Sequence, residues 1–258
     1  MPRFYIDEDI FEGTLLDLPP GAARHVQVIR MQPGQNITLF NGKPNAHGLY
    51  GEHPASITQM GRAQVQVQVG AWLNTPLHPL CDLHLALGMP ANERMDWLIE
   101  KATELGVASI QPLMAERSVL RLQGERAVRK MAHWRGIAIA ACEQCGGNRV
   151  PVIHPVLQLK DWLPVSCMTT SRRAVLSLNA STRFVQDFLQ GSTTSVVTCL
   201  LGPEGGFTAT EETTALHHGF EPVSLGVRVL RTETAALTVA ALAAYSCQTQ
   251  DKCLGYGQ

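Results

Sequence analysis

The first 72 residues show the alternation of polar and apolar side chains that is typical of half-buried β-strands. The segments 36–40 (NITLF) and 64–69 (QVQVQV) follow this period of two, and the second segment keeps it over six residues. Seven glycines, from Gly13 to Gly61, separate the runs at turn-like intervals. This pattern predicts a small β-barrel over residues 1–72.

The stretch 73–80, LNTPLHPL, separates this region from the rest of the chain. It contains no charged side chain, and each of Pro76 and Pro79 removes a backbone donor and favours extended geometry in the preceding residue. We interpret 73–80 as a linker, followed by a second domain over 81–258.

Beyond residue 80, short apolar runs alternate with longer segments of helical period. Strands are expected at 83–87, 110–114, 174–178, 196–201 and 223–225, and helices at 92–105, 124–142, 182–189, 209–218 and 233–247. In the first helix, Asn92 is a candidate cap, and Gly106 follows its end, where a left-handed residue is often needed. Strands that alternate with helices predict an α/β domain with a mostly parallel sheet.

Two glycine-containing loops in the last third of the chain are candidate binding segments. The loop 202–206 (GPEGG) follows an expected strand and precedes a helix, and Thr208 with Glu211 has the spacing of a capping box. The loop 225–235 (LGVRVLRTETA) also follows a strand and opens a helix, with Thr232 or Thr234 as possible caps. Ligands meet free backbone N–H groups at helix amino termini and bind at the carboxyl ends of parallel strands. We therefore expect both loops to line one pocket, although tight turns without a ligand would have the same sequence pattern.

The composition excludes several classes of protein. Hydrophobic residues make up 45% of the chain and charged residues 17%, which is typical of a globular protein, and the formal net charge of −1 gives no global basic excess. The longest mostly apolar stretch, 235–245, is shorter than the ~20 residues that cross a bilayer. The amino terminus MPRFYIDEDIFEG lacks the basic and then apolar pattern of a secretory signal. We expect a cytoplasmic protein with no membrane partner.

The cysteines do not predict a disulfide framework or a metal site. The seven cysteines are an odd and modest number. Cys142 and Cys145 have the spacing of a redox or metal pair, but no second such pair exists, and His154 has no partner at zinc-finger spacing. We interpret the pair as structural.

Five stretches of the chain resemble one enzyme family. LGPEGGFT at 201–208 and LGVRVLRTETAALT at 225–238 are similar to the cofactor loops of the bacterial 16S ribosomal RNA uridine N3-methyltransferases, which are S-adenosylmethionine-dependent enzymes of the SPOUT class. ERMDWLIEKATELGV at 93–107 and IAIAACEQCGGNRVP at 137–151 resemble other characteristic stretches of that family. HVQVIRMQPGQNITLFNG at 25–42 resembles its amino-terminal PUA-like barrel.

The resemblance implies a fold, a reaction and a cofactor site. The fold is a PUA-like RNA-binding β-barrel followed by a SPOUT α/β domain with a deep trefoil knot, in a homodimer without a metal. The reaction methylates N3 of uridine 1498 in 16S rRNA of the small ribosomal subunit, with S-adenosylmethionine as the cofactor. The implied cofactor residues are Leu178, Leu201, Gly202, Pro203, Glu204, Gly205, Gly206, Leu225, Gly226, Leu230, Thr232, Thr234 and Ala235. Asn179 departs from the Leu-His-Pro-like turn that is frequent in the family, so no role is carried over to it.

Methyl transfer to N3 of uridine requires the loss of a weakly acidic proton and stabilisation of the anion left between two carbonyl groups. Beside the second loop, Arg231 supplies a cation and Glu233 a carboxylate, while Arg228 and Glu204 are a second cation and a second carboxylate. We hypothesise that Arg231 stabilises the uridine anion or orients the base, supported by Glu233 or Glu204. In the alternative, Arg231 and Glu233 only pair at a helix start.

Positive charge is concentrated between residues 117 and 135, where six Arg and Lys side chains face one acid, Glu125, a local balance of +5. Contacts with phosphates dominate RNA affinity, although a solvated helix face has a similar composition. The expected RNA-binding residues are Arg3, Arg24, Arg30, Arg117, Arg121 and Arg228. Two other functions fit the sequence, namely a SPOUT methyltransferase for another rRNA or tRNA site and a catalytically silent RNA-binding ribosome-assembly factor.

Overall fold

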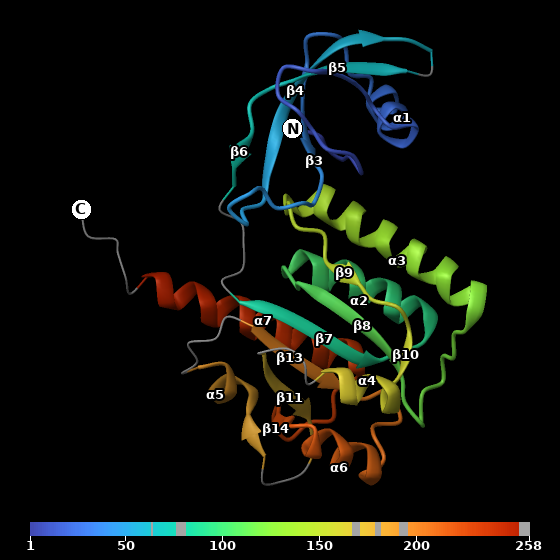
Figure 1. Ribbon diagram of the computed structural model, residues 1–258, viewed down its shortest axis with the longest axis vertical. Helices are drawn as coiled ribbons and strands as arrows, with labels where there is room; N and C mark the ends of the chain where they lie inside the picture. Colours follow the sequence, from blue (N-terminus) through green and yellow to red (C-terminus); the bar gives the residue numbers. More distant parts are fainter. Residues whose placement is uncertain (63, 76–80, 167–170, 179–181, 191–195, 253–258) are drawn as a thin grey trace. The chain divides into compact units, whose positions relative to one another are not determined.

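The computed structural model describes the chain except for residues 63, 76–80, 167–170, 179–181, 191–195 and 253–258. The chain divides into two compact units (Figure 1). The first unit comprises Met1–His78 together with Ile139–Val150, and the second comprises Pro79–Ala138 together with Pro151–Gln258. Residues 139–150 therefore belong with the amino-terminal unit, although their place in the sequence assigns them to the second domain.

The amino-terminal unit is built on a sheet with the strand order β1-β3-β4-β5-β2, in which β6 also pairs with β4. Its elements are β1 (Arg3–Tyr5), β2 (Leu15–Asp17), α1 (Pro20–Val28), β3 (Asn36–Phe40), β4 (Gly51–Met60), β5 (Val65–Val69) and β6 (Leu73–Asn74). In β5, Val65, Val67 and Val69 are buried in the core, and the glutamines between them are more exposed. The two predicted strands are confirmed. The linker prediction is wrong at Leu73 and Asn74, because their backbone pairs with β4; residues 76–80 lie outside the described residues.

A buried arginine holds residues 147–148 within the amino-terminal unit. Arg3 Nη2 donates a hydrogen bond to Asn148 Oδ1 at 2.6 Å, and its guanidinium forms an ion pair with Glu52 and lies over the ring of Phe40. The Arg3 side chain is only 14% exposed. Arg3 is therefore an interior cation with several protein partners, which does not fit the expectation that it contacts RNA.

The two cysteines of the CxxC sequence differ in their surroundings. Cys142 is buried and its Sγ donates to Arg149 O at 3.4 Å, whereas Cys145 is exposed. Burial raises the pKa of the Cys142 thiol to about 12. Cys142 is thus a protonated interior thiol at neutral pH, and a poor nucleophile.

The second unit contains a sheet in which all the described strand pairings are parallel. The strand order is β10-β8-β7-β13-β11-β14-β12, with β9 also paired to β8. The strands are β7 (Asp82–Gly88), β8 (Ser109–Met114), β9 (Val152–Ile153), β10 (Leu157–Gln158), β11 (Arg172–Leu176), β12 (Arg183–Phe184), β13 (Val196–Leu201) and β14 (Glu221–Ser224). The prediction of an α/β domain with a mostly parallel sheet is confirmed.

Helices α4 to α7 pack against this sheet, α2 packs on α7, and α3 runs from the second unit into the first (Figure 1). Their bounds are α2 (Asn92–Glu104), α3 (Gly124–Cys145), α4 (Leu159–Ser166), α5 (Val185–Leu189), α6 (Ala209–His217) and α7 (Thr232–Lys252). α7 packs on α2, α5, β7 and β13, whereas α4 packs on α6 and α6 on β11. On the side of α4 and α6, Trp162 and Phe220 share a core with Val175 and Leu200. The helix predicted over 182–189 is shorter, because Arg183 and Phe184 pair with β14 as β12.

Helix α2 follows the predicted apolar face but begins without the predicted cap. Met95, Leu98, Ile99 and Ala102 are all fully buried, and Gly106 beyond the helix has a φ of +77°. Ala91, and not Asn92, is the N-cap residue, and it has no side chain that can accept a hydrogen bond. The first turn of α2 therefore needs an acceptor from another part of the chain.

Asp96 connects α2 to α3. Its Oδ1 accepts a hydrogen bond from the indole Nε1 of the fully buried Trp134 at 2.9 Å, its Oδ2 contacts His133 Nε2 at 2.9 Å, and Lys130 Nζ is 3.4 Å from Oδ1. Burial by itself raises the pKa of Asp96, but the hydrogen bonds from His133 and Trp134 and the charge of Lys130 outweigh it and lower this pKa below the usual 3.8.

We expect Asp96→Ala to lower the free energy of unfolding by about 1–3 kcal/mol at neutral pH, because it leaves the Trp134 N–H buried without an acceptor. The pKa of Asp96 is lower in the folded than in the unfolded state, so the stabilisation by its charge is complete above pH 3.8 and is lost as the pH falls through the folded-state pKa. Urea unfolding of the wild type and the variant over a pH series measures both effects. A stability difference that does not shrink in acid would contradict the assignment.

Candidate functional site

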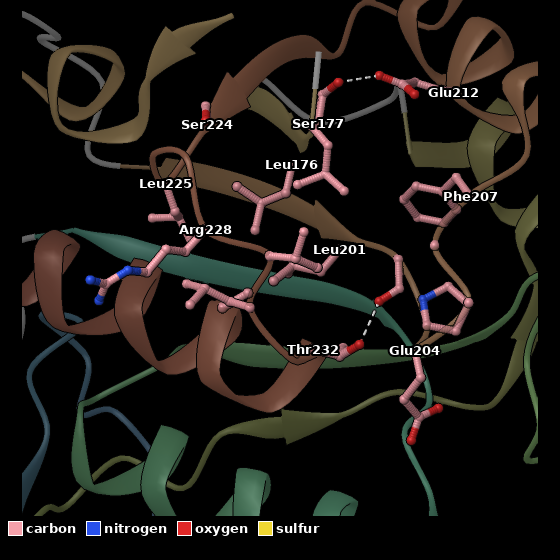
Figure 2. A pocket seen from close by; sticks show the side chains of 18 of the residues that line it. Leu176, Ser177, Leu201, Glu204, Phe207, Glu212, Ser224, Leu225, Arg228 and Thr232 are labelled. Atoms are coloured by element: carbon pink, nitrogen blue, oxygen red, sulfur yellow. Dashed lines mark hydrogen bonds between the residues drawn. The ribbon is translucent and has the colours of Figure 1, made fainter. Parts of the chain in front are cut away.

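A cavity of about 410 Å³ lies at the carboxyl ends of three neighbouring strands (Figure 2). Leu176 ends β11, Leu201 ends β13 and Ser224 ends β14, and all three line it. Its volume falls within the roughly 300–1,000 Å³ that is usual for small-molecule sites. Both glycine loops contribute to its walls, so the expectation that they share one pocket is confirmed.

Most of the residues expected to bind the cofactor line this cavity. They are Leu178, Leu201, Gly202, Pro203, Glu204, Gly205, Gly206, Leu225, Gly226, Leu230, Thr232 and Ala235. Thr234 is not among the lining residues and is exposed on α7. Asn179 lies outside the described residues. The cavity is also lined by residues that were not predicted from the sequence, namely Leu176, Ser177, Phe207, Glu212, Ser224 and Val229. Those at strand ends follow from the rule that ligands bind at the carboxyl ends of strands.

The first glycine loop is packed closely against itself. A Cβ atom at Gly202 would lie 3.2 Å from both Gly206 Cα and Phe207 N, and the backbone N–H of Gly206 donates to Pro203 O at 2.8 Å. Gly206 has a φ of +67°, in the region that glycine adopts most readily. The loop therefore presents backbone to the cavity in a conformation that larger residues would disturb.

Helix α6 begins directly after this loop with the predicted capping box. Thr208 Oγ1 accepts a hydrogen bond from Glu211 N at 3.2 Å, and Glu211 Oε2 accepts one from Thr208 N at 2.9 Å. The capping box is confirmed. The capping box fixes the residue at which the first glycine loop ends and α6 begins. It thereby fixes the direction in which the chain leaves the cavity.

Two of the expected RNA-binding arginines contact the protein itself. Arg117 Nη1 donates to Gly205 O at 3.1 Å and to Phe207 O at 3.5 Å, and Arg117 also lines the cavity. A Cβ atom at Gly205 would lie 2.9 Å from Arg117 Cβ. The neighbouring Arg121 donates from Nη2 to Glu116 O at 2.9 Å. Arg117 therefore supports the first loop from the side of β8.

The second loop joins the first through a hydrogen bond. Thr232 Oγ1, in the first turn of α7, donates to Gly202 O at 2.8 Å. Ser224 Oγ accepts from Gly226 N at 3.1 Å, and Gly226 has a φ of +108°. Val229, which follows in the loop, is largely exposed although it lines the cavity. Thr232 thus uses its hydroxyl to hold the two loops together.

The cavity combines apolar walls with a polar pair at one end. Ser177 Oγ donates a hydrogen bond to the carboxylate of Glu212, and Figure 2 shows this pair above Leu176 and Leu201, away from Arg228. The side chains of Leu176 and Leu201 offer apolar contact, and the carboxylate offers an acceptor for hydroxyl or ammonium groups. This combination suits a ligand with an aromatic ring and a polar or cationic part.

The three predicted catalytic residues do not meet in the cavity. Arg231 is exposed directly before α7, and its carbonyl oxygen accepts from Ala235 N at 2.8 Å. Glu233 is 7% exposed, and its Oε1 is 3.8 Å from Arg94 Nε. Glu204 Oε1 is 3.2 Å from Arg94 Nη1, and Figure 2 shows the Glu204 side chain turned away from the other cavity residues. Among the described residues neither carboxylate pairs with Arg231, so the alternative of an Arg231–Glu233 ion pair is wrong.

The remaining predicted RNA-binding residues are exposed cations. Arg228 lines the cavity on the second loop. Arg24 lies on α1 and Arg30 follows it, where Arg30 has a φ of +57°. Their exposure leaves them accessible to a polyanion.

In the described part of the chain, no helix is long and apolar enough to cross a bilayer. In the same residues, no group of three or more His, Cys, Asp or Glu side chains is placed to hold a metal ion.

Comparisons with known proteins agree with this geometry. The profile of the RNA methyltransferase domain matches residues 76–244. The chain is 30% identical over 263 residues to ribosomal RNA small subunit methyltransferase E of Bacillus subtilis. This alignment covers 97% of this chain and 98% of that protein.

Two solved structures share the fold over nearly their whole length. One is ribosomal RNA small subunit methyltransferase E from Neisseria gonorrhoeae bound to S-adenosyl methionine, with 34% identity, a TM-score of 0.83, and coverage of 97% of this chain and 98% of that one. The other is a methyltransferase from Legionella pneumophila in complex with SAM, with 36% identity, a TM-score of 0.83, and coverage of 95% and 97%. The chain therefore belongs to the RNA methyltransferase family, among the relatives of ribosomal RNA small subunit methyltransferase E.

Proposed function

We propose that this protein is an S-adenosylmethionine-dependent methyltransferase that methylates N3 of uridine 1498 in 16S rRNA of the small ribosomal subunit. The observation that carries the proposal is the convergence of both glycine loops on one cavity at the carboxyl ends of β11, β13 and β14. The relatives from N. gonorrhoeae and L. pneumophila were solved with this cofactor, and the B. subtilis relative is named for the small-subunit rRNA.

The residues of the cavity fit S-adenosylmethionine. Leu176, Leu201 and Leu225 suit the apolar faces of an adenine ring, and the backbone of 202–206 suits its polar edge. The Glu212 carboxylate suits ribose hydroxyls or the ammonium group. When bound, this cofactor supplies an electrophilic methyl group on a positively charged sulfur.

The protein's contribution to the reaction is to position the uridine and to stabilise charge. Loss of the N3 proton spreads negative charge over the two neighbouring carbonyl oxygens, and a fixed cation beside them favours that anion. Arg231 is exposed between Leu230 and Thr232, which both line the cavity, so its guanidinium is accessible to a base brought to the cavity. In this proposal Arg231 stabilises the uridine anion, and the loops orient N3 toward the methyl group.

The proposal includes the finer features of the fold and assembly. It assigns a PUA-like barrel to the amino-terminal unit, a SPOUT fold with a deep trefoil knot to the second unit, and a homodimer in the cytoplasm, where small ribosomal subunits are found. The bond between Thr232 and Gly202 supports a close association of the two loops of such a knot, and the exposed Val227 and Val229 support an apolar contact with a second subunit. Arg24, Arg30, Arg121 and Arg228 are the cations proposed to contact RNA phosphates.

The test is a methylation assay on defined RNA. The protein is incubated with labelled S-adenosylmethionine and with small subunits that lack the modification, and the methylated nucleoside is identified by mass spectrometry after digestion. We expect 3-methyluridine at position 1498. Label on a different nucleotide would refute the substrate but not the enzyme class, and no label despite cofactor binding would refute the proposed reaction.

A further inference from the structure

Arg94, in the first turn of α2, contacts carboxylates from two separate loops. Its Nη1 is 3.2 Å from Glu204 Oε1 in the first glycine loop, and its Nε is 3.8 Å from Glu233 Oε1 at the start of α7. The two acids are 29 positions apart in the sequence, and neither lies near Arg94 in it. A single guanidinium therefore connects α2, the first loop and the segment that closes the second loop.

The Glu204 carboxylate also accepts a hydrogen bond from one of the backbone N–H groups left free at the start of α2. Its Oε1 accepts a hydrogen bond from the backbone N–H of Ala91 at 3.1 Å, and Ala91 is the N-cap residue without a capping side chain. A carboxylate at a helix amino terminus is also favoured by the helix dipole. The first glycine loop is thus attached to the start of α2 by both the backbone of Ala91 and the side chain of Arg94.

Glu233 needs Arg94 as the opposite charge that compensates its buried carboxylate. The carboxylate is nine-tenths buried, and its second oxygen, Oε2, has no hydrogen-bond partner among the described residues. A buried carboxylate is costly unless an opposite charge is close, and Arg94 provides that charge. The preceding residue, Thr232, binds Gly202 O directly. The start of α7 is therefore held to the first loop by the Thr232 hydroxyl and, through Arg94, by Glu233.

We propose that Arg94 is a positioning residue for the cofactor, which fixes the two glycine loops at the separation that the cofactor requires. The proposal rests on the proposed function, because it assigns Arg94 to the same cavity. Arg94 does not line the cavity, and it acts through Glu204 and Glu233. Such preorganisation improves affinity because the loops need not be ordered when the ligand binds.

The test is the affinity for S-adenosylmethionine, measured by calorimetry on the full chain. We expect Arg94→Met to raise Kd about tenfold, the effect of losing a charge-assisted contact, when Kd is measured at a temperature at which the variant is folded. The cofactor-free variant is expected to melt below the wild type, because the buried Glu233 loses its compensating charge. In turnover, KM for the cofactor is expected to rise more than kcat falls. Lys101→Met is the matched control, because Lys101 on the same helix also pairs with two carboxylates, Glu100 and Glu104, but both lie on α2. We expect no change in Kd for this control.

A second variant separates positioning from folding. Glu204→Gln keeps an oxygen for the Ala91 N–H but removes the charge that attracts Arg94. The Kd for S-adenosylmethionine is therefore expected to rise, as it does in Arg94→Met. If both residues act through one contact, the double variant binds the cofactor no more weakly than Arg94→Met. Equal affinity of wild type and Arg94→Met, or multiplied effects in the double variant, would overturn the inference. Absence of cofactor binding by the wild type would instead overturn the proposed function.

Discussion

Arg231→Ala is expected to keep the affinity for S-adenosylmethionine and to lose about 100- to 1,000-fold in kcat for uridine methylation, the loss that follows removal of one group that stabilises a developing anion. The side chain is exposed and makes no hydrogen bond or ion pair within the described part of the chain, so its removal leaves no buried partner unsatisfied. Its two sequence neighbours, Leu230 and Thr232, line the cavity. The cation is therefore placed for the substrate base and not for the protein core.

The measurement compares single-turnover rates of Arg231→Ala, Arg231→Lys and Arg228→Ala on unmodified small subunits. Arg231→Lys retains a positive charge and is expected to recover part of the rate. Arg228 also lines the cavity and is exposed, so its variant shows whether the anion is stabilised by the other cation of the second loop. Full methyl transfer by Arg231→Ala with normal folding would refute the assigned role.

Gly88→Ala is expected to destabilise the protein by about 1–3 kcal/mol, through overpacking, and to weaken cofactor binding. Gly88 is the last residue of β7, and a Cβ atom there would lie 2.5 Å from the backbone N of Pro203 and 2.6 Å from its Cδ. Neither atom belongs to a flexible side chain, so the first glycine loop has to move as a whole. Because Pro203 and Gly202 line the cavity, that movement changes the cofactor site itself.

The matched control for Gly88→Ala is Gly136→Ala. A Cβ atom at Gly136, inside α3, would meet no other atom within 4 Å, and alanine is a better helix former than glycine. We expect this control to raise the free energy of unfolding by about 0.5–1 kcal/mol and to leave Kd unchanged. Urea unfolding and calorimetry on both variants measure the two effects. Wild-type stability and affinity in Gly88→Ala would show that Pro203 does not restrict this position.

The apolar pattern of the chain was sufficient for most of its elements, because period and burial are local properties of a sequence. The faces of α2 and β5 follow directly from the spacing of Met95, Leu98 and Ile99 and from alternating valines. The pattern gave no prediction for α1, β4 or α4, and it missed β6 and β12, since two residues are too few to show a period. It also failed at residues 139–150, whose packing with the amino-terminal unit depends on contacts such as that between Arg3 and Asn148.

The candidate site, like the fold, was predicted from the sequence only in part. Sequence identified the two glycine loops and their convergence, because the carboxyl ends of neighbouring parallel strands meet at one edge of a sheet. It did not identify Ser177 and Glu212, which come from different elements and meet only in the folded chain. It grouped Glu204 and Glu233 with Arg231, whereas the structure places both carboxylates at Arg94.

The sequence by itself determined the parallel α/β architecture, the two loops, and the resemblance to the uridine N3-methyltransferases, because each is encoded in the order and spacing of neighbouring residues. Only the tertiary structure decided which charges face each other. Arg3 became an interior partner of Glu52 and Asn148, and Arg117 a support of the first loop. Arg94 became the common partner of two carboxylates. Such pairings depend on distances across the fold, and the composition of a segment carries no information about the partner that packing brings to it.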